Sequence, residues 1–282
     1  MGIRINTNIS SINTQRHLLN STNMFAKSME KLSSGLRINR AGDDAAGLAI
    51  SEGLKSDIRA LDQAGRNAAD GIALLQIAEG AANEISSMLQ RMRELAVQSS
   101  NDTLTSTERT YTNQEYQALM SEIDRVTSVT QYNSQTLLTG TTDSFGGLNS
   151  ASSVLHIGPN SSATNTLSIS LVGTSTGAIQ ISNSAITTQA SAGRSIASID
   201  IAIGSINAMR SNIGAYVNRL EHAINNLDNQ MHNTQSAESL IRDVDFAAET
   251  TTFTRNQIMV QSATAMLAQA NTVPQTILTL LR

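Results

Sequence analysis

The residues best suited to bind a metal ion are four histidines, and their spacing argues against a metal site. No i, i+4 pair and no cysteine accompanies His17, His156, His222 and His232. Zinc and iron sites are usually assembled from closely spaced His and Cys ligands. We therefore expect no metal and no cofactor. We expect the histidines to face solvent or to make ordinary hydrogen bonds.

Asp43 and Asp44 are adjacent carboxylates that could act in acid–base catalysis. They also precede a long segment of periodic apolar residues, where carboxylates stabilise a helix start by facing unpaired N–H groups and the positive end of the helix dipole. No GxxxxGK[ST], HExxH or GxSxG motif occurs. The helix-start interpretation is the simpler one, and we predict that the chain is not an enzyme.

Arg91, Arg93 and Glu94 bring charges together within about one turn of a predicted helix. One interpretation is a solvated face whose charge spacing supports the helix. The other is a strip that a partner recognises. The spacing alone does not decide between them.

Three segments carry the apolar periodicity of long helices. In 43–100, apolar residues recur at steps of three and four that average about 3.5, the heptad period of a coiled coil. A shorter pattern at 111–126 follows the polar break at 99–107 and is expected to double back, and a third pattern runs over 196–231. Because three apolar stripes can be hidden only against one another, the sequence predicts an antiparallel helical bundle.

The middle of the chain is different. Between Arg125 and Arg194 the only charged residue is Asp143, and Ser, Thr, Asn and Gly dominate. Alternation of apolar and polar residues predicts half-buried strands, joined by turns, at 154–157, 167–171 and 179–181. We expect a β-rich insert at about 134–190.

Both ends of the chain carry apolar stripes, although termini are normally polar and frayed. Such ends are expected to be buried by something else, and we assign them to self-assembly. The assigned residues are Ile5, Ile9, Ile12 and Leu19 in the N-terminal segment and Phe253, Val260, Val273, Ile277, Leu280 and Leu281 in the C-terminal segment.

Composition excludes several classes of partner. The net charge of −4 offers no footprint for nucleic acid or anionic lipid. No run reaches the ~18 apolar residues of a membrane span, and residues 1–10 lack the features of a secretory signal. We expect neither a nucleic-acid partner nor membrane insertion. The lack of cysteine leaves the compartment open but suits a chain threaded unfolded through a secretion channel.

Several motifs resemble those of bacterial flagellins. They are LSSGLRIN at 32–39, DDAAGLAI at 43–50, RNAADG at 66–71, QRMRELAVQ at 90–98 and LAQANTVPQTILTLLR at 267–282. The resemblance covers roughly residues 3–140 and 190–282. The intervening segment is too short for the outer domains that many flagellins carry, so the chain resembles a short form.

The resemblance implies a mostly α fold, with long heptad-patterned helices in an antiparallel coiled-coil bundle and a small β-hairpin region in the middle. The terminal helices are expected to pair as a coiled coil in the polymer. Residues 1–40 and 241–282 would form the two halves of an inner-tube helical domain. Residues 41–240 would form the helical-bundle domain.

The resemblance also implies a function: self-assembly into an extracellular flagellar filament, after export as an unfolded chain without a cleaved signal peptide. The implied partners are further copies of the chain, filament cap and hook-junction proteins, an export chaperone at the C-terminal segment and the vertebrate Toll-like flagellin receptor. The positions matching the receptor-binding strip are Gln90, Arg91, Glu94, Leu95, Gln98 and Glu115.

Two rivals stand beside the filament subunit. A hook–filament junction protein shares related termini but not usually the motifs at 43–50 and 90–98 in this form. A coiled-coil signalling module also has heptads, but it would need neither a neutral β-rich insert nor apolar chain ends. For the insert, an O-glycosylated surface and an unmodified neutral surface both stay open.

Overall fold

The computed structural model describes residues 7–140 and 153–280, and for residues 153 and 273–280 only the backbone. The chain divides into two compact units. We call residues 1–58 with 232–282 the terminal unit and residues 59–231 the central unit. Each is described by itself.

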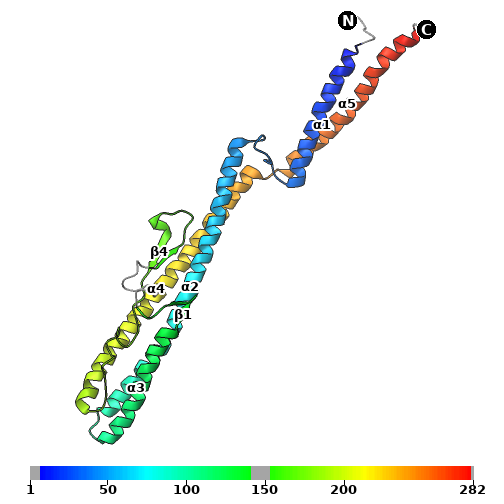
Figure 1. Cartoon of the computed structure of the whole chain (residues 1–282). Coiled ribbons are helices and arrows are strands. Elements are labelled where there is room, and N and C mark those ends of the chain that lie inside the picture. Colours follow the sequence, from blue (N-terminus) through cyan, green and yellow to red (C-terminus); the bar gives the residue numbers. More distant parts are fainter. Residues whose placement is uncertain (1–6, 141–152, 281–282) are drawn as a thin grey trace. The chain divides into compact units, whose positions relative to one another are not determined.

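Five long helices account for most of the described chain (Figure 1). The predicted mostly α fold is confirmed, and the helices expected at 43–100, 111–126 and 196–231 are all present. Their bounds are α1 Ile9–Ser34, α2 Ala45–Ser99, α3 Ser106–Val129, α4 Gln189–Arg242 and α5 Phe246–Leu280.

Local capping explains where two of these helices begin. The Asp44 carboxylate accepts a hydrogen bond from the Gly47 amide (2.9 Å), which confirms the predicted helix start before α2. At α3, Thr105 and Glu108 form a reciprocal capping box. The hydrogen bond from the Thr105 backbone amide holds the pKa of Glu108 below its ordinary value.

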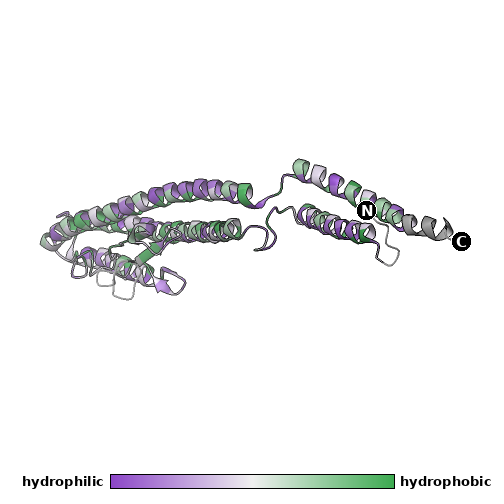
Figure 2. Cartoon of the chain, turned by 90° about the horizontal axis from the view of Figure 1, so that it is seen from above, coloured by the Kyte–Doolittle hydropathy of each residue, from purple (hydrophilic) through white to green (hydrophobic). Residues whose placement is uncertain are grey.

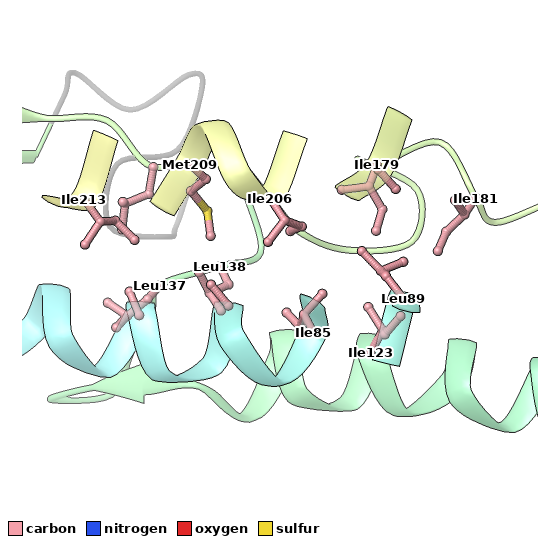
Figure 3. Packing of buried hydrophobic residues seen from close by; sticks show 14 of the residues in the cluster. Ile85, Leu89, Ile123, Leu137, Leu138, Ile179, Ile181, Ile206, Met209 and Ile213 are labelled. Atoms are coloured by element: carbon pink, nitrogen blue, oxygen red, sulfur yellow. The ribbon is translucent and has the colours of Figure 1, made fainter. Parts of the chain in front are cut away.

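The core of the central unit lies where α2, α3 and α4 meet. Ile85 and Leu89 of α2 pack with Ile206 and Met209 of α4 and Ile123 of α3, and all five side chains are buried (Figure 3). These residues recur at the heptad steps seen in the sequence. The three helices therefore bury their apolar stripes against one another, as the pattern predicted.

Two small antiparallel hairpins interrupt the helical pattern. The strands β1 Gln131–Tyr132 and β2 Gln135–Thr136 are joined by Asn133 and Ser134, both with positive φ, as a tight hairpin turn requires. The strands β3 Ser153–His156 and β4 Thr166–Ile169 pair with each other. This second hairpin confirms strands at two of the three predicted places.

The third predicted strand, at Ile179–Ile181, is wrong. Both isoleucines are buried and Gln180 between them is exposed, so the alternation in burial is as expected. However, Gln180 has a φ of 62°, and the Ile179 amide donates to the Ser175 carbonyl in a turn. A turn with a left-handed central residue exposes every second side chain just as a strand does.

This turn belongs to an irregular segment, residues 170–188, which we call the strap. Asp124 of α3 accepts hydrogen bonds from the Thr176 amide (2.9 Å) and hydroxyl (2.8 Å). Ser99 of α2 and Ser195 of α4 donate to strap carbonyl groups. The strap is thus fastened to all three helices of the central unit, and it buries its isoleucines against their core.

The strap passes close to the backbone at Gly140, which makes Gly173 sensitive to substitution. A Cβ at Gly173 would lie 2.9 Å from Gly140 Cα and 3.1 Å from the Thr139 carbonyl oxygen. Because backbone atoms cannot rotate away, we expect Gly173→Ala to lower the free energy of unfolding by about 1–3 kcal/mol. Urea unfolding of the full chain, followed by circular dichroism, measures this change.

Gly177→Ala is the matched control in the same strap. A Cβ at Gly177 meets nothing within 4 Å. We expect this variant to match the unsubstituted chain or to gain a few tenths of a kcal/mol. Equal stability of the two alanine variants would contradict the close approach at Gly173.

Candidate functional site

In the terminal unit, α1 and α5 pack along each other as an antiparallel pair (Figure 1). The residues facing the partner recur at steps of three and four, so the pair has the seam of a coiled coil. On α1 they are Ser11, Thr14, Leu18, Ser21, Phe25 and Ser28, and on α5 they are Glu249, Phe253, Asn256, Val260, Ala263, Leu267 and Ala270.

Small and polar residues alternate with large ones in this seam. Phe25 and Phe253 stack with ring centroids 4.9 Å apart. Beside them, the Asn256 side-chain amide donates to the hydroxyl of Ser28, which is only 4% exposed (3.2 Å). Because seven of the thirteen seam positions are Ser, Thr, Asn or Ala, the pair hides little of the apolar surface of its two helices.

Large apolar side chains therefore remain outside the seam. Figure 2 shows hydrophobic and hydrophilic residues intermixed along both terminal helices. The large side chains that are more than half exposed are Ile9, Ile12, Leu19, Met24 and Met29 on α1 and Phe246, Ile258, Met259 and Met266 on α5. An exposed apolar surface of this extent is typical of a protein–protein interface.

The residues assigned to self-assembly from sequence divide into three groups. Ile9, Ile12 and Leu19 are exposed, whereas Phe253 and Val260 are half-buried in the seam. Val273, Ile277 and Leu280 lie on α5 at positions where only the backbone is described, and Ile5 and Leu281 fall outside the described residues.

Sequence reasoning missed the exposed residues Met24, Ile258 and Met259. They were missed because they do not fall on the heptad steps, which the seam occupies. The signal was present in the sequence: a second set of large apolar residues beside the first indicates a helix that contacts more than one partner.

A second candidate site is the charged strip on α2 and α3 of the central unit. The Arg91 guanidinium donates to Glu115 of α3 through Nε (2.9 Å) and to Glu94 through Nη1 (3.0 Å). These hydrogen bonds, first that to Glu94, raise the pKa of Arg91 above its ordinary value. The Arg91 and Glu115 side chains are about half exposed and that of Glu94 is 68% exposed, so the pairs orient the guanidinium at the surface rather than contribute much stability.

The structure places most of the predicted receptor-facing residues together on this surface. Gln90, Glu94 and Gln98 line a shallow hollow with Arg93 and Val97. Arg93 is not part of the matching set, and it pairs separately with Asp200 of α4 (2.7 Å).

Leu95 corrects the expectation of a surface contact. Its side chain is 1% exposed and belongs to the central core, because it lies on the inward side of α2 between Met92 and Ala96. It cannot supply an apolar anchor to a partner without being pulled out of that core. Val97, which is 50% exposed, is the apolar residue that this surface offers.

The histidines face solvent as expected: all four side chains are exposed. Within residues 7–140 and 153–280, no group of three or more His, Asp or Glu side chains is arranged to hold a metal ion. None of the helices in these ranges has an apolar stretch long enough to cross a membrane.

Comparison with known proteins gives concordant matches over nearly the whole chain. The family described as the bacterial flagellin N-terminal helical region matches residues 5–143, and the bacterial flagellin C-terminal helical region matches residues 196–281. A flagellin of Halalkalibacterium halodurans is 49% identical over 278 residues, which is 99% of both chains. The flagellar filament 33 kDa core protein of Treponema phagedenis is 45% identical over 99% of both chains.

Among solved structures, the crystal structure of Bacillus cereus flagellin superposes with a TM-score of 0.50 at 30% identity. It covers 57% of this chain and 88% of its own. The likeness thus extends from sequence to the helical architecture. The chain belongs to the bacterial flagellin family.

Proposed function

We propose that this chain polymerises through its terminal unit into the flagellar filament. As a flagellin, it is a structural component of the extracellular filament, built from many copies of one chain. The observation that carries the proposal is the large apolar surface of α1 and α5, which the pair leaves exposed. Further copies of the same chain would cover it and gain roughly 25 cal/mol for each Å² removed from water.

The proposed arrangement assigns residues 1–40 and 241–282 to an inner tube and residues 41–240 to the surrounding helical bundle. Sedimentation with electron microscopy of the purified chain, seeded with filament fragments, tests it. Long uniform tubes are expected. Neither a coiled-coil signalling module nor a hook–filament junction protein would yield them.

We further infer that the terminal helices become ordered only on assembly. Isolated helices are marginal in water, and this pair buries little apolar surface of its own. Such ends suit export as an unfolded chain without a cleaved signal peptide. Filament cap and hook-junction proteins would then contact the same terminal helices at the two ends of the polymer.

Before assembly, the exposed apolar face of α5 is an aggregation hazard. We therefore propose an export chaperone with a groove that binds α5, which enters the groove as an amphipathic helix. We expect a cytoplasmic pull-down with the full chain to recover one specific protein. The same bait carrying Ile258→Gln, Met259→Gln and Met266→Gln should recover about tenfold less, since each exposed side chain supplies part of the apolar contact.

The matched control for the chaperone carries Ile9→Gln, Ile12→Gln and Leu19→Gln on α1, which are similarly exposed. This variant should retain the chaperone, because the proposed binding segment is C-terminal. Recovery of the partner by a chain that ends before residue 246 would rule out this binding site.

Recognition by the vertebrate Toll-like flagellin receptor is proposed for the exposed part of the strip, with Arg91 as the main contact. A surface arginine held by two carboxylates is pre-oriented, so little side-chain entropy is lost when a partner binds. Gln90, Glu94, Gln98 and Glu115 would surround it.

A further inference from the structure

The seam of α1 and α5 does not by itself fix which residues of the two helices lie opposite each other. Large residues recur one heptad apart, at Leu18 and Phe25 on α1 and at Phe253, Val260 and Leu267 on α5. A slide of seven residues would again place large side chains against large ones. An apolar pattern with this repeat permits more than one register, so some other contact has to select one.

A backbone contact between the end of α1 and the start of α5 has the required specificity. The Arg37 amide donates to the Arg242 carbonyl (2.6 Å), and the Val244 amide donates to the Gly35 carbonyl (3.0 Å). We call residues 35–37 with 241–244 the clamp. Each of its hydrogen bonds joins one particular amide to one particular carbonyl group. A slide of seven residues would leave these amide and carbonyl groups without their partners.

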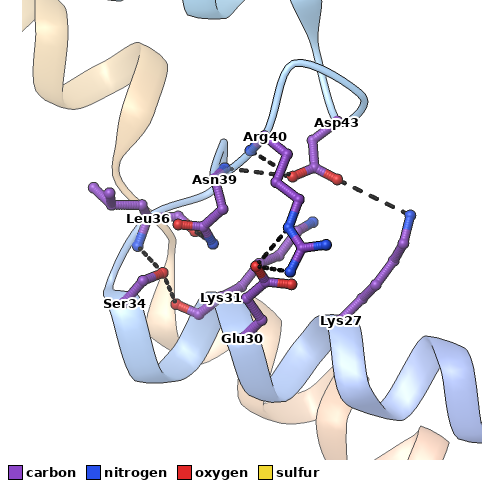
Figure 4. A network of polar contacts seen from close by, with 8 residues as sticks. All are labelled: Lys27, Glu30, Lys31, Ser34, Leu36, Asn39, Arg40 and Asp43. Carbon is purple, nitrogen blue, oxygen red and sulfur yellow. Dashed lines mark hydrogen bonds and ion pairs between the residues drawn. The ribbon is translucent and has the colours of Figure 1, made fainter.

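The residues on the N-terminal side of the clamp are held by their own contacts. Gly35, with a φ of 71°, ends α1 by donating its amide to the Lys31 carbonyl. In the loop that follows, the Asp43 carboxylate accepts from the Asn39 and Arg40 amides (Figure 4). The bond from Arg40 is the main reason that the pKa of Asp43 lies below its ordinary value.

The other side of the clamp is fastened by arginine side chains. Arg37 Nη2 donates to the Ile241 carbonyl (2.6 Å), and Arg242 Nη1 donates to Glu52 (2.9 Å). The Arg242 side chain is only 17% exposed, so this ion pair is less screened by solvent than the surface pairs of the chain. Both segments of the clamp, 35–37 and 241–244, are therefore held in place at the point where α1 ends and α5 begins.

Contacts far from the clamp keep the register that the clamp sets. Phe25 stacks on Phe253, and near the far end of the pair the Asn8 side chain donates to the Ala270 carbonyl (2.8 Å). Both steps along the pair, from Phe25 to Asn8 and from Phe253 to Ala270, are seventeen residues. The two helices therefore keep one register from the clamp to the start of α1.

We propose that the clamp selects the register of the terminal helix pair and so defines the surface that assembling copies meet. The inference deepens the proposed function and rests on it for its consequence in the filament. A slide of seven residues would move α5 by about 10 Å along α1. The exposed Ile258 and Met259 would then be displaced by this distance relative to the exposed apolar residues of α1, so each register would present a different assembly surface.

Cysteine cross-linking measures the register, because the chain has no cysteine of its own. Ser11 and Asn271 touch in the observed register (2.8 Å), so Ser11→Cys with Asn271→Cys reports that register. Ser11→Cys with Thr264→Cys reports the register slid by one heptad. Each pair is oxidised in the full chain during seeded polymerisation, and soluble and sedimented fractions are pooled before the linked product is quantified.

Val244→Pro removes one clamp hydrogen bond, since proline has no N–H. Position 244 precedes Asp245, which caps α5 through the Ala247 and Ala248 amides, so the substitution leaves the hydrogen bonds of α5 intact. We expect the ratio of native to slid cross-link to fall at least about tenfold, which corresponds to about 1.4 kcal/mol. Val244→Ala, which keeps the N–H, should leave the ratio unchanged.

The outcomes are distinct. An unchanged ratio in Val244→Pro, with or without filaments, would overturn the clamp as the register-selecting element, and so would an equal fall in Val244→Ala. If the unsubstituted clamp gives the native cross-link but no filaments form, the proposed function fails while the register assignment stands.

Discussion

A chain that ends at Ala270 should keep its folded central unit and lose the ability to polymerise. The truncation removes Val273, Ile277, Leu280 and Leu281, each of which is worth roughly 1.5–3 kcal/mol when buried. Even partial burial of these side chains between copies amounts to several kcal/mol. The critical concentration for polymerisation should therefore rise by about three orders of magnitude or more, as measured by sedimentation of seeded reactions.

A full-length chain with glutamine at the same four positions separates loss of apolar surface from loss of length. It should fail to polymerise as the truncated chain does. Thermal unfolding followed by circular dichroism should show an unchanged main transition in both, because the central core lies within residues 59–231. Filaments of normal stability from the truncated chain would show that the C-terminal residues do not drive assembly.

Heptad periodicity made the helices predictable from the sequence. The apolar stripe of α2 runs unbroken along the helix, and Ile85, Leu89 and Met92 are buried as the pattern requires. The strap was less predictable, because burial alternates in a turn around Gln180 as it does in a strand. Only the backbone conformation distinguishes the two, and a side-chain pattern does not carry it.

The candidate sites show the same division. The motif match identified Gln90, Arg91, Glu94 and Gln98, which are all exposed in the structure. It also included Leu95, which faces the core. Matching positions records which residues occur together and not which way each one points. Likewise, the hydrogen bonds of the clamp join backbone groups about two hundred residues apart in the chain, and amide and carbonyl groups leave no trace in residue types.

Arg91→Ala in depolymerised protein should weaken activation of the Toll-like flagellin receptor about thirtyfold, the effect of losing a hot-spot arginine worth ~2 kcal/mol. The substitution removes the guanidinium that Glu94 and Glu115 orient at the surface. Leu95→Ala would not test recognition, because replacing a buried leucine with alanine lowers the free energy of unfolding by about 2–5 kcal/mol. A receptor-reporter assay over a range of protein concentrations measures the change.

Arg66→Ala is the matched control, since Arg66 is similarly exposed on the same helix and also forms a surface ion pair, with Asp62, but lies outside the strip. Both alanine variants should keep the helical circular dichroism of the unsubstituted chain, because alanine is a good helix former and both pairs are surface pairs of small energetic weight. A loss of potency confined to Arg91→Ala would assign recognition to that side chain. Equal potency of all three folded proteins would remove the receptor assignment and leave the filament assignment intact, because polymerisation depends on the terminal helices and not on this strip.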